Sequence, residues 1–240
     1  MENEKIIKKL EWDSDFFNIN ICRINNNISS HEDLKKVIKE LKKYDIDLGY
    51  YSSVQPLKEL NHNSEPYDIT FVDKKVTYLK EIKNKHQIQY SITAYMGEYP
   101  NDMLINLAIQ SGIYSRFNID SRISRVKYEE LYRQWIVNSV NKKFAKEVLV
   151  CYGNDSILGF ITVGEKNLIA DIGLIAVDAN YRGKGIGKSL IYAAENWFIQ
   201  HNYKQVQVIT QTDNLSACKL YENCGYMKNK IEYFYHLWKK

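Results

Sequence analysis

The sequence predicts an α/β protein, because short apolar runs of strand length alternate with segments of helical periodicity. Residues 172–177 form one such run, and Asp178 begins a turn signal directly after it. From Ile186 to Phe198 apolar residues then recur at helical spacing. The chain therefore passes from a buried strand into a helix across a stretch rich in glycine, and this transition is the centre of the predicted fold.

The turn between this strand and this helix, Arg182-Gly183-Lys184-Gly185-Ile186-Gly187, has the composition of an anion-binding loop. Glycines at a helix start let the backbone approach a ligand closely, and the first N–H groups of a helix point outward with the positive end of its dipole. Arg182, Lys184 and Lys188 add charge that suits a pyrophosphate. The loop fits neither the GxxxxGKS/T loop nor the G-x-G-x-x-G fingerprint, so another phosphate-bearing cofactor is indicated. An ordinary strand-to-helix turn is the alternative.

A second motif follows a predicted strand further along the chain. Asp213 or Asn214 suits the N-cap of a short helix, and Gly225 suits its C-terminal stop. Asn214, Ala217 and Tyr221 then share one face of that helix. The spacing therefore places the phenol of Tyr221 on the helix face that also carries Asn214 and Ala217.

Together the two motifs resemble the acetyl-CoA site of the GCN5-related N-acetyltransferase (GNAT) superfamily. The matching pattern is Arg182-x-x-Gly185-x-Gly187, then a strand over Val206–Gln211, then Asn214-x-x-Ala217-x-x-x-Tyr221-x-x-x-Gly225-Tyr226. The resemblance implies a mixed, mostly antiparallel central sheet flanked by helices, with acetyl-CoA as co-substrate. The expected cofactor-binding residues are Ile175, Ala176, Val177, Arg182, Gly183, Lys184, Gly185, Ile186, Gly187, Lys188, Asn214, Ala217 and Tyr221.

Acyl transfer from a thioester to an amine needs a neutral amine, a stabilised oxyanion and a proton for the leaving thiolate. In the superfamily the tyrosine that matches Tyr221 supplies this proton as general acid, and backbone N–H groups near the positions of Ile175 to Val177 polarise the thioester carbonyl. A tyrosine that only packs at the helix end is the alternative. The general base is not identified: Asp73 and Glu98 are candidates, and a water chain or deprotonation before binding would need neither.

Three further stretches resemble the TDP-fucosamine acetyltransferases of bacterial surface-polysaccharide synthesis: residues 12–17, 107–117 and 131–135. This resemblance implies N-acetylation of the 4-amino group of a dTDP-linked 4-amino-4,6-dideoxyhexose. Ser115, Arg116 and Phe117 lie in the matching loop and are expected substrate contacts. Alternatively, Arg116 forms a surface ion pair and Phe117 packs in the core.

Two other function classes stay open beside this one. The first is a GNAT acetyltransferase of another amine, such as a protein N-terminus, an amino acid or a polyamine. The second is a CoA-binding regulatory domain without turnover, and Tyr221 argues against it because a sensor has no need of a thiolate-protonating phenol. Activity that depends on the amino-terminal third of the chain would favour the sugar-nucleotide enzyme over the first.

Composition limits the partners and the location of the protein. Hydrophobic residues make up 45% and charged residues 26%, which is typical of a soluble globular protein. No apolar run approaches the length of a membrane span, and no signal peptide is indicated, so we expect a cytoplasmic protein with no membrane partner. The four cysteines and five histidines lack CxxC and HxxxH spacing, so no metal site is expected. The net charge of +4 allows anionic ligands without indicating nucleic acid, and a homodimer is left open.

The remaining pattern predicts two domains, an N-terminal α/β domain over residues 1–85 and an acetyltransferase domain over residues 86–240, with a charged linker at Glu81–Gln87. The expected elements, in order, are a strand through Ile19 to Arg23, a helix capped by Ser30, strands Ile46–Val54 and Ile69–Leu79, a helix from Asp102 to Ser111, a loop Ile113–Asp120, a helix Lys127–Val140, and a hairpin of Glu147–Tyr152 and Ile157–Val163 with its turn at Gly153-Asn154-Asp155.

Overall fold

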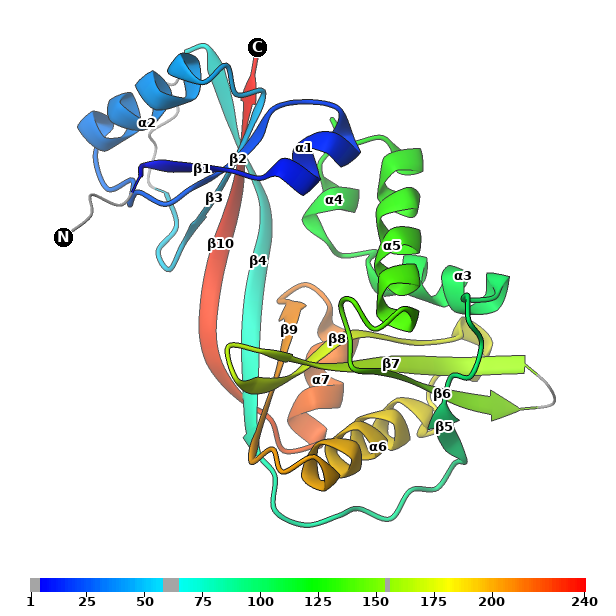
Figure 1. The fold of residues 1–240 in the computed structure, drawn as a ribbon. Coiled ribbons are helices and arrows are strands. Elements are labelled where there is room, and N and C mark those ends of the chain that lie inside the picture. The colour runs from blue at the N-terminus through cyan, green and yellow to red at the C-terminus, as the bar shows by residue number, and fades with distance from the viewer. Residues whose placement is uncertain (1–4, 58–64, 154–155) are drawn as a thin grey trace. The chain divides into compact units, whose positions relative to one another are not determined.

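The computed structural model describes residues 5–57, 65–153 and 156–240 (Figure 1). The chain divides into two compact units, one of Met1–Lys75 with Ile231–Lys240 and one of Val76–Lys230. Two long strands, β4 (Tyr67–Glu81) and β10 (Met227–Lys239), contribute residues to both units. The domain boundary expected after residue 85 stays a prediction.

The first unit is a small α/β unit. Its elements are β1 (Ile7–Lys9), α1 (Glu11–Phe17), β2 (Ile21–Ile24), α2 (His31–Lys43) and β3 (Leu48–Ser53). Its strands follow the order β1-β2-β3-β10-β4, and β2 and β3 are parallel. As predicted, Ser30 caps α2 by accepting a hydrogen bond from Asp33 N, and the buried residues of α2 recur at helical spacing against the strands.

The sheet of the second unit follows the order β4-β9-β8-β7-β6-β5. Its strands after β4 are β5 (Ile92–Ala94), β6 (Glu147–Gly153), β7 (Ser156–Lys166), β8 (Ile169–Val177) and β9 (Gln205–Gln211). The pairs β5–β6, β6–β7 and β7–β8 are antiparallel, whereas β8–β9 is parallel. The predicted mixed, mostly antiparallel sheet is therefore confirmed.

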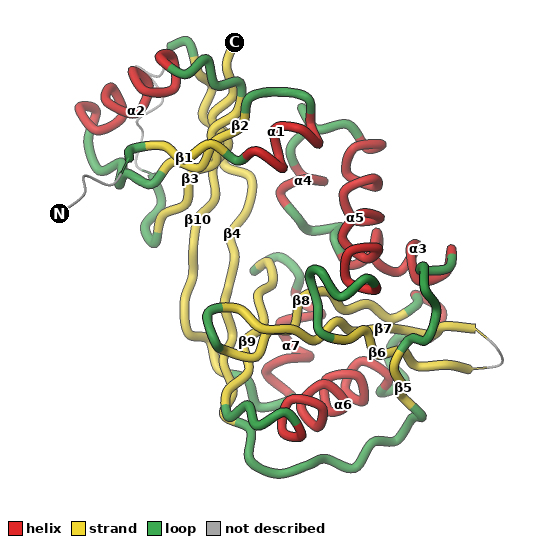
Figure 2. Tube along the Cα trace, in the orientation of Figure 1, coloured by secondary structure: helices red, strands yellow, loops and turns green. Residues whose placement is uncertain are grey.

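Helices cover both faces of this sheet (Figure 2). The helices are α3 (Asp102–Ser111), α4 (Arg116–Ile119), α5 (Arg125–Val140), α6 (Ile186–Gln200) and α7 (Leu215–Asn223). Val148 and Val150 of β6 pack with α3 and α5, whereas Leu149 and Cys151 pack with α6 and α7. Since successive side chains of a strand point to opposite faces, the sheet separates two cores.

The structure differs from the predicted elements in three helices, the first of which is α1 over Glu11–Phe17, a helix that was not predicted. The expected loop Ile113–Asp120 contains the one-turn helix α4, in which Ile119 N donates to Ser115 O at 3.0 Å. A single turn is too short to give a periodic pattern. α5 begins at Arg125 instead of Lys127, because Ser124 is the N-cap and its hydroxyl accepts from Lys127 N.

Several strand predictions also need correction, and one turn is left untested. β2 and β3 begin two residues later than predicted, β4 runs from Tyr67 to Glu81, further at both ends than predicted, and the three-residue strands β1 and β5 were not predicted. The predicted hairpin of β6 and β7 is confirmed by pairing from Glu147↔Val163 to Gly153↔Ser156. Asn154 and Asp155 of its turn lie outside the described residues.

Candidate active site

The strands β8 and β9 are parallel neighbours over only part of their length. Within the described part of the chain, their register ends at Ile172↔Val208. On its other side, β8 continues to pair with β7 as far as Val177. Successive residues of an antiparallel strand direct their N–H and C=O groups alternately to the two sides of the strand. Within residues 175–177, the backbone groups that do not face β7 therefore point to the side of β9.

A bulge distorts β8 just before these residues. The buried Thr162 of β7 accepts a hydrogen bond from Leu174 N through Oγ1 at 2.8 Å, and the register between the strands shifts between Ile161 and Val163. A Cβ atom on Gly173 would come within 2.8 Å of the same Oγ1. Gly173 therefore permits the close approach of the two strands. This bulge was not predicted from the sequence, although an isolated glycine in an apolar strand is its usual signal.

The glycine-rich loop leads from β8 into α6 as predicted. Gly183 and Gly185 have φ values of 76° and 87°, and Gly185 is the N-cap of α6 without any side-chain cap. The N–H groups of Ile186, Gly187 and Lys188 belong to the first turn, so they lack acceptors within the helix. They lie at the positive end of the helix dipole and form a cradle suited to an anion.

The positive side chains of this loop are exposed, although one is partly used within the protein. Arg182 Nε donates to Val177 O at 3.1 Å, which ties the loop back to the end of β8. Lys184 Nζ lies 4.9 Å from the ring centre of Tyr181. Lys188 is exposed on the first turn of α6. The three cations belong to the loop and the first turn of α6, and their positive charge adds to the attraction of these N–H groups for an anion.

The helix α7 begins next to the end of β9. Asn214 is its N-cap and accepts a hydrogen bond from Ala217 N at 3.2 Å, so of the two predicted caps the structure uses Asn214 rather than Asp213. Gly225 follows the helix with a φ value of 85°, as a helix stop requires. The predicted short helix is confirmed, and its cap orients the side chain of Asn214 toward the first turn.

Tyr221 lies near the end of α7, and 2% of its surface is exposed. Its ring centre is 5.8 Å from that of Tyr78 and 6.0 Å from that of Tyr226. Burial raises the pKa of Tyr221, and the neighbouring Cys218 and Cys224 add to this effect, so the phenol stays protonated and neutral. Its burial fits a tyrosine that only packs at the helix end, and its protonated state fits a general acid. A measurement of turnover is needed to distinguish these two roles.

The comparison with known proteins places this site in a family. Residues 112–226 match the acetyltransferase (GNAT) family. The matched stretch contains the anion-binding loop, β9 and α7, including Tyr221. This stretch is a GNAT-family acetyltransferase domain. The superfamily and the enzyme class predicted from the two motifs are thereby confirmed at the level of this domain.

Three curated relatives share parts of the chain. The spore coat polysaccharide biosynthesis protein SpsD of Bacillus subtilis is 26% identical over 137 residues, which cover 57% of this chain and 47% of that protein. A dTDP-fucosamine acetyltransferase of Escherichia coli is 33% identical over 96 residues, covering 39% and 40%. N-alpha-acetyltransferase 30 of Xenopus laevis is 39% identical over 66 residues, covering 28% and 24%. The chain thus spans about half the length of these relatives or less.

A solved structure shows the same fold. The crystal structure of a GNAT-family acetyltransferase from Novosphingobium aromaticivorans matches 81% of this chain and 75% of that chain, with a TM-score of 0.53. Its sequence identity to this chain is 11%, so the likeness concerns the fold alone. It confirms the predicted GNAT architecture.

The predicted substrate contacts lie at the start of the GNAT domain. Ser115 is buried at the N-cap of α4, and the buried Phe117 packs edge-on against Trp135 of α5 with ring centres 6.0 Å apart. The guanidinium carbon of Arg116 lies 4.7 Å from the ring centre of Phe117. Phe117 therefore has the packing role of the alternative interpretation, and a substrate contact stays a prediction for the three residues.

Neither candidate for the general base is assigned by its contacts. Asp73 is buried on β4 in the first unit and lies 3.9 Å from Lys75 Nζ. Glu98 is exposed in the loop after β5 of the second unit. Among the described residues, no group of three or more His, Cys, Asp and Glu side chains is placed to hold a metal ion. In the same described part, no helix is long and apolar enough to cross a bilayer.

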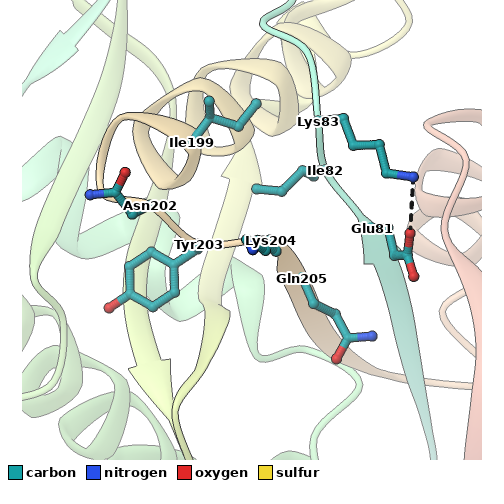
Figure 3. Close-up of a pocket in the computed structure, with 8 residues that line it drawn as sticks. All are labelled: Glu81, Ile82, Lys83, Ile199, Asn202, Tyr203, Lys204 and Gln205. Carbon is teal, nitrogen blue, oxygen red and sulfur yellow. Dashed lines mark ion pairs between the residues drawn. The ribbon is translucent and has the colours of Figure 1, made fainter.

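A pocket of about 750 Å³ lies at the far end of α6 (Figure 3). Its lining residues are Glu81, Ile82, Lys83, Ile199, Asn202, Tyr203, Lys204 and Gln205. None of the predicted cofactor or substrate residues is among them. Because the anion-binding loop is at the N-terminal end of the 15-residue α6, this pocket is separated from it by the length of the helix.

Proposed function

We propose that the chain is an acetyl-CoA-dependent N-acetyltransferase, and that its acceptor is the 4-amino group of a dTDP-linked 4-amino-4,6-dideoxyhexose. The observation that supports the donor is the uncapped start of α6, where first-turn N–H groups and three cationic side chains coincide. The acceptor is supported by the resemblance of the chain to sugar-nucleotide acetyltransferases and by the relatives SpsD and dTDP-fucosamine acetyltransferase.

In this proposal the pyrophosphate of acetyl-CoA is held by the loop Arg182–Gly187 and by Lys188. Backbone groups of Ile175 to Val177, which face β9, hold the acyl end of the cofactor, and Asn214 and Ala217 border it from α7. Acetyl-CoA supplies the acetyl group as a thioester. Protein N–H groups at the strand edge stabilise the negative charge that develops on the thioester oxygen.

Tyr221 would complete the reaction as general acid. The acceptor nitrogen forms a bond to the acetyl carbon, the carbon–sulfur bond breaks, and the leaving thiolate takes a proton from the phenol. Burial favours this role because it keeps the phenol protonated before the reaction. The proton released by the attacking amine passes to water or to a base that the contacts of the described residues do not assign.

A second candidate is acetylation of a peptide N-terminus. The specific observation in its favour is the similarity to N-alpha-acetyltransferase 30, which extends over 66 residues and 28% of this chain. The proposal for the sugar nucleotide draws on a longer similarity, since SpsD matches 57% of the chain. Both candidates use the same donor site, so only the acceptor distinguishes them.

A CoA-release assay across a panel of acceptors tests the proposal. The panel contains dTDP- and UDP-linked amino sugars, a peptide with a free N-terminus and spermine. We expect dTDP-4-amino-4,6-dideoxygalactose to exceed spermine and the peptide by about 10²-fold or more in kcat/KM, because a site that pairs a buried polar group rejects acceptors lacking its partner. A preference for the peptide would refute the acceptor and keep the donor. Binding of acetyl-CoA without turnover of any acceptor would favour a regulatory domain.

A further inference from the structure

The segment between β4 and β5, residues 82–91, is bound along α6 instead of spanning open solvent. We call it the strap. The backbone of His86 is paired with the side chain of Asn196 on α6: His86 N donates to Asn196 Oδ1 at 2.7 Å, and Asn196 Nδ2 donates to His86 O at 2.9 Å. The His86 ring also stacks on Tyr192 of α6, with centres 4.0 Å apart. The strap is therefore fixed to the helix that starts at the anion-binding loop.

A buried ion cluster strengthens this attachment. Glu195 of α6 is fully buried, and its carboxylate accepts from Lys80 Nζ at 2.7 Å and lies 2.6 Å from His86 Nε2. A buried carboxylate without partners would cost several kcal/mol, so this pairing holds β4, the strap and α6 in one arrangement. The strap consequently has a fixed path beside α6.

The end of the strap reaches the anion-binding loop. The hydroxyl of Tyr90 donates a hydrogen bond to Lys184 O at 2.7 Å. A Cβ atom built on Gly185 would lie 3.3 Å from Gln89 Oε1 and 4.0 Å from Tyr90 Cε2. The backbone of the loop at Gly185 is thus covered on one side by two side chains of the strap.

This hydrogen bond determines the direction of a neighbouring N–H group. The peptide bond between Lys184 and Gly185 is trans, so the Lys184 carbonyl and the Gly185 N–H point in opposite directions in one plane. When Tyr90 holds the carbonyl, the N–H of Gly185 is directed away from the strap. That N–H belongs to the N-cap of α6 and is one of the four helix-start donors that have no acceptor within the helix.

We propose that Tyr90 is a positioning residue for the diphosphate of acetyl-CoA, acting through the Lys184–Gly185 peptide. The inference rests on the proposed function, because it concerns the same donor site. Tyr90 orients the Gly185 N–H before the cofactor binds, so the protein does not have to order this peptide during binding. The strap, anchored by His86 and Asn196, keeps the Tyr90 hydroxyl in place.

The test uses Tyr90→Phe in the full chain, with binding measured by calorimetry and turnover by CoA release. We expect the Kd for acetyl-CoA to rise about threefold to tenfold, which corresponds to one neutral hydrogen bond, while kcat at saturating acetyl-CoA stays within about twofold of wild type. Dephospho-CoA keeps the diphosphate and lacks the 3′-phosphate. Its Kd should rise by the same factor, since the affected contact is to the diphosphate.

The matched control is Tyr203→Phe, which removes another tyrosine hydroxyl beside the far end of α6, where Lys146 donates to it at 2.6 Å. This variant should bind both ligands like wild type. The inference is overturned if Tyr90→Phe also binds both ligands like wild type, or if only the affinity for acetyl-CoA and not that for dephospho-CoA falls. Wild-type protein that binds neither ligand would refute the proposed function itself, so the two failures are distinguishable.

Discussion

Replacing Tyr221 with phenylalanine tests the proposed general acid while keeping the packing of α7. The ring of Tyr221 packs with the rings of Tyr78 and Tyr226, whose centres are 5.8 Å and 6.0 Å away. Phenylalanine retains this ring and removes only the hydroxyl. The free energy of unfolding should therefore change by about 1 kcal/mol or less, the net scale expected for a single hydroxyl group.

The catalytic effect should be larger than the structural one. A phenol that hands its proton to the leaving thiolate contributes about 10²-fold or more to kcat, which equals about 2.7 kcal/mol of transition-state stabilisation. Since only 2% of Tyr221 is exposed, bulk water does not replace the lost proton without a rearrangement of the core. We expect kcat of Tyr221→Phe to fall by that factor, with the Kd for acetyl-CoA nearly unchanged.

The pH profile provides a second readout. Burial raises the folded-state pKa of Tyr221 above the unfolded value of about 10, so its contribution to stability is complete below pH 10 and declines only as the pH rises further. Between pH 7 and pH 9 the phenol stays protonated, and kcat of the wild type should show no decline from its ionisation. The reasoning is refuted if Tyr221→Phe binds acetyl-CoA normally and turns over within a few-fold of wild type while chemistry limits both rates.

Two further substitutions test the donor loop and the ion cluster. Gly185→Ala adds about 1–2 kcal/mol of backbone strain at a φ of 87° and should weaken acetyl-CoA binding measured by calorimetry. The control Gly225→Ala, at a φ of 85°, should lose a similar unfolding free energy and bind acetyl-CoA like wild type. If the two variants bind acetyl-CoA with the same affinity, the loop at Gly185 is not the anion-binding cradle. Glu195→Ala leaves the buried end of Lys80 without its carboxylate and should cost about 3 kcal/mol or more in denaturant unfolding, whereas Glu129→Ala, from an exposed ion pair, should cost about 0.5 kcal/mol or less. A similar loss in both variants would show that burial does not strengthen the cluster.

The parts of the fold that the sequence predicted are those with a local physical signal. The helix capped by Ser30, the loop before α6 and the short helix α7 each combine a cap or a glycine with a periodic pattern. The prediction failed where the signal was short: β5 has three residues and α4 has four, so neither gives a measurable period.

The part of the candidate site that depends on backbone conformation could be predicted from the sequence. Gly183 and Gly185 have the positive φ values that glycine permits, and their pattern marks the start of α6. The strap contacts could not be predicted, because Tyr90 and Lys184 are 94 residues apart and meet only through the packing of β5 and α6 in one unit. The buried pair of Lys80 and Glu195 was missed for the same reason, since nothing local to either residue indicates the other.

The chain needs different features to recognise the acetyl donor and the amine acceptor. The diphosphate is bound by backbone N–H groups, which require a conformation and a few glycines but no particular side chains. A donor site of this kind can therefore be combined with recognition sites for different amines. The acceptor must be recognised by side chains brought together from distant segments, so no short pattern in the sequence identifies which amine is bound. The family of this domain consequently follows from its loop, whereas its substrate has to be determined with the acceptors themselves.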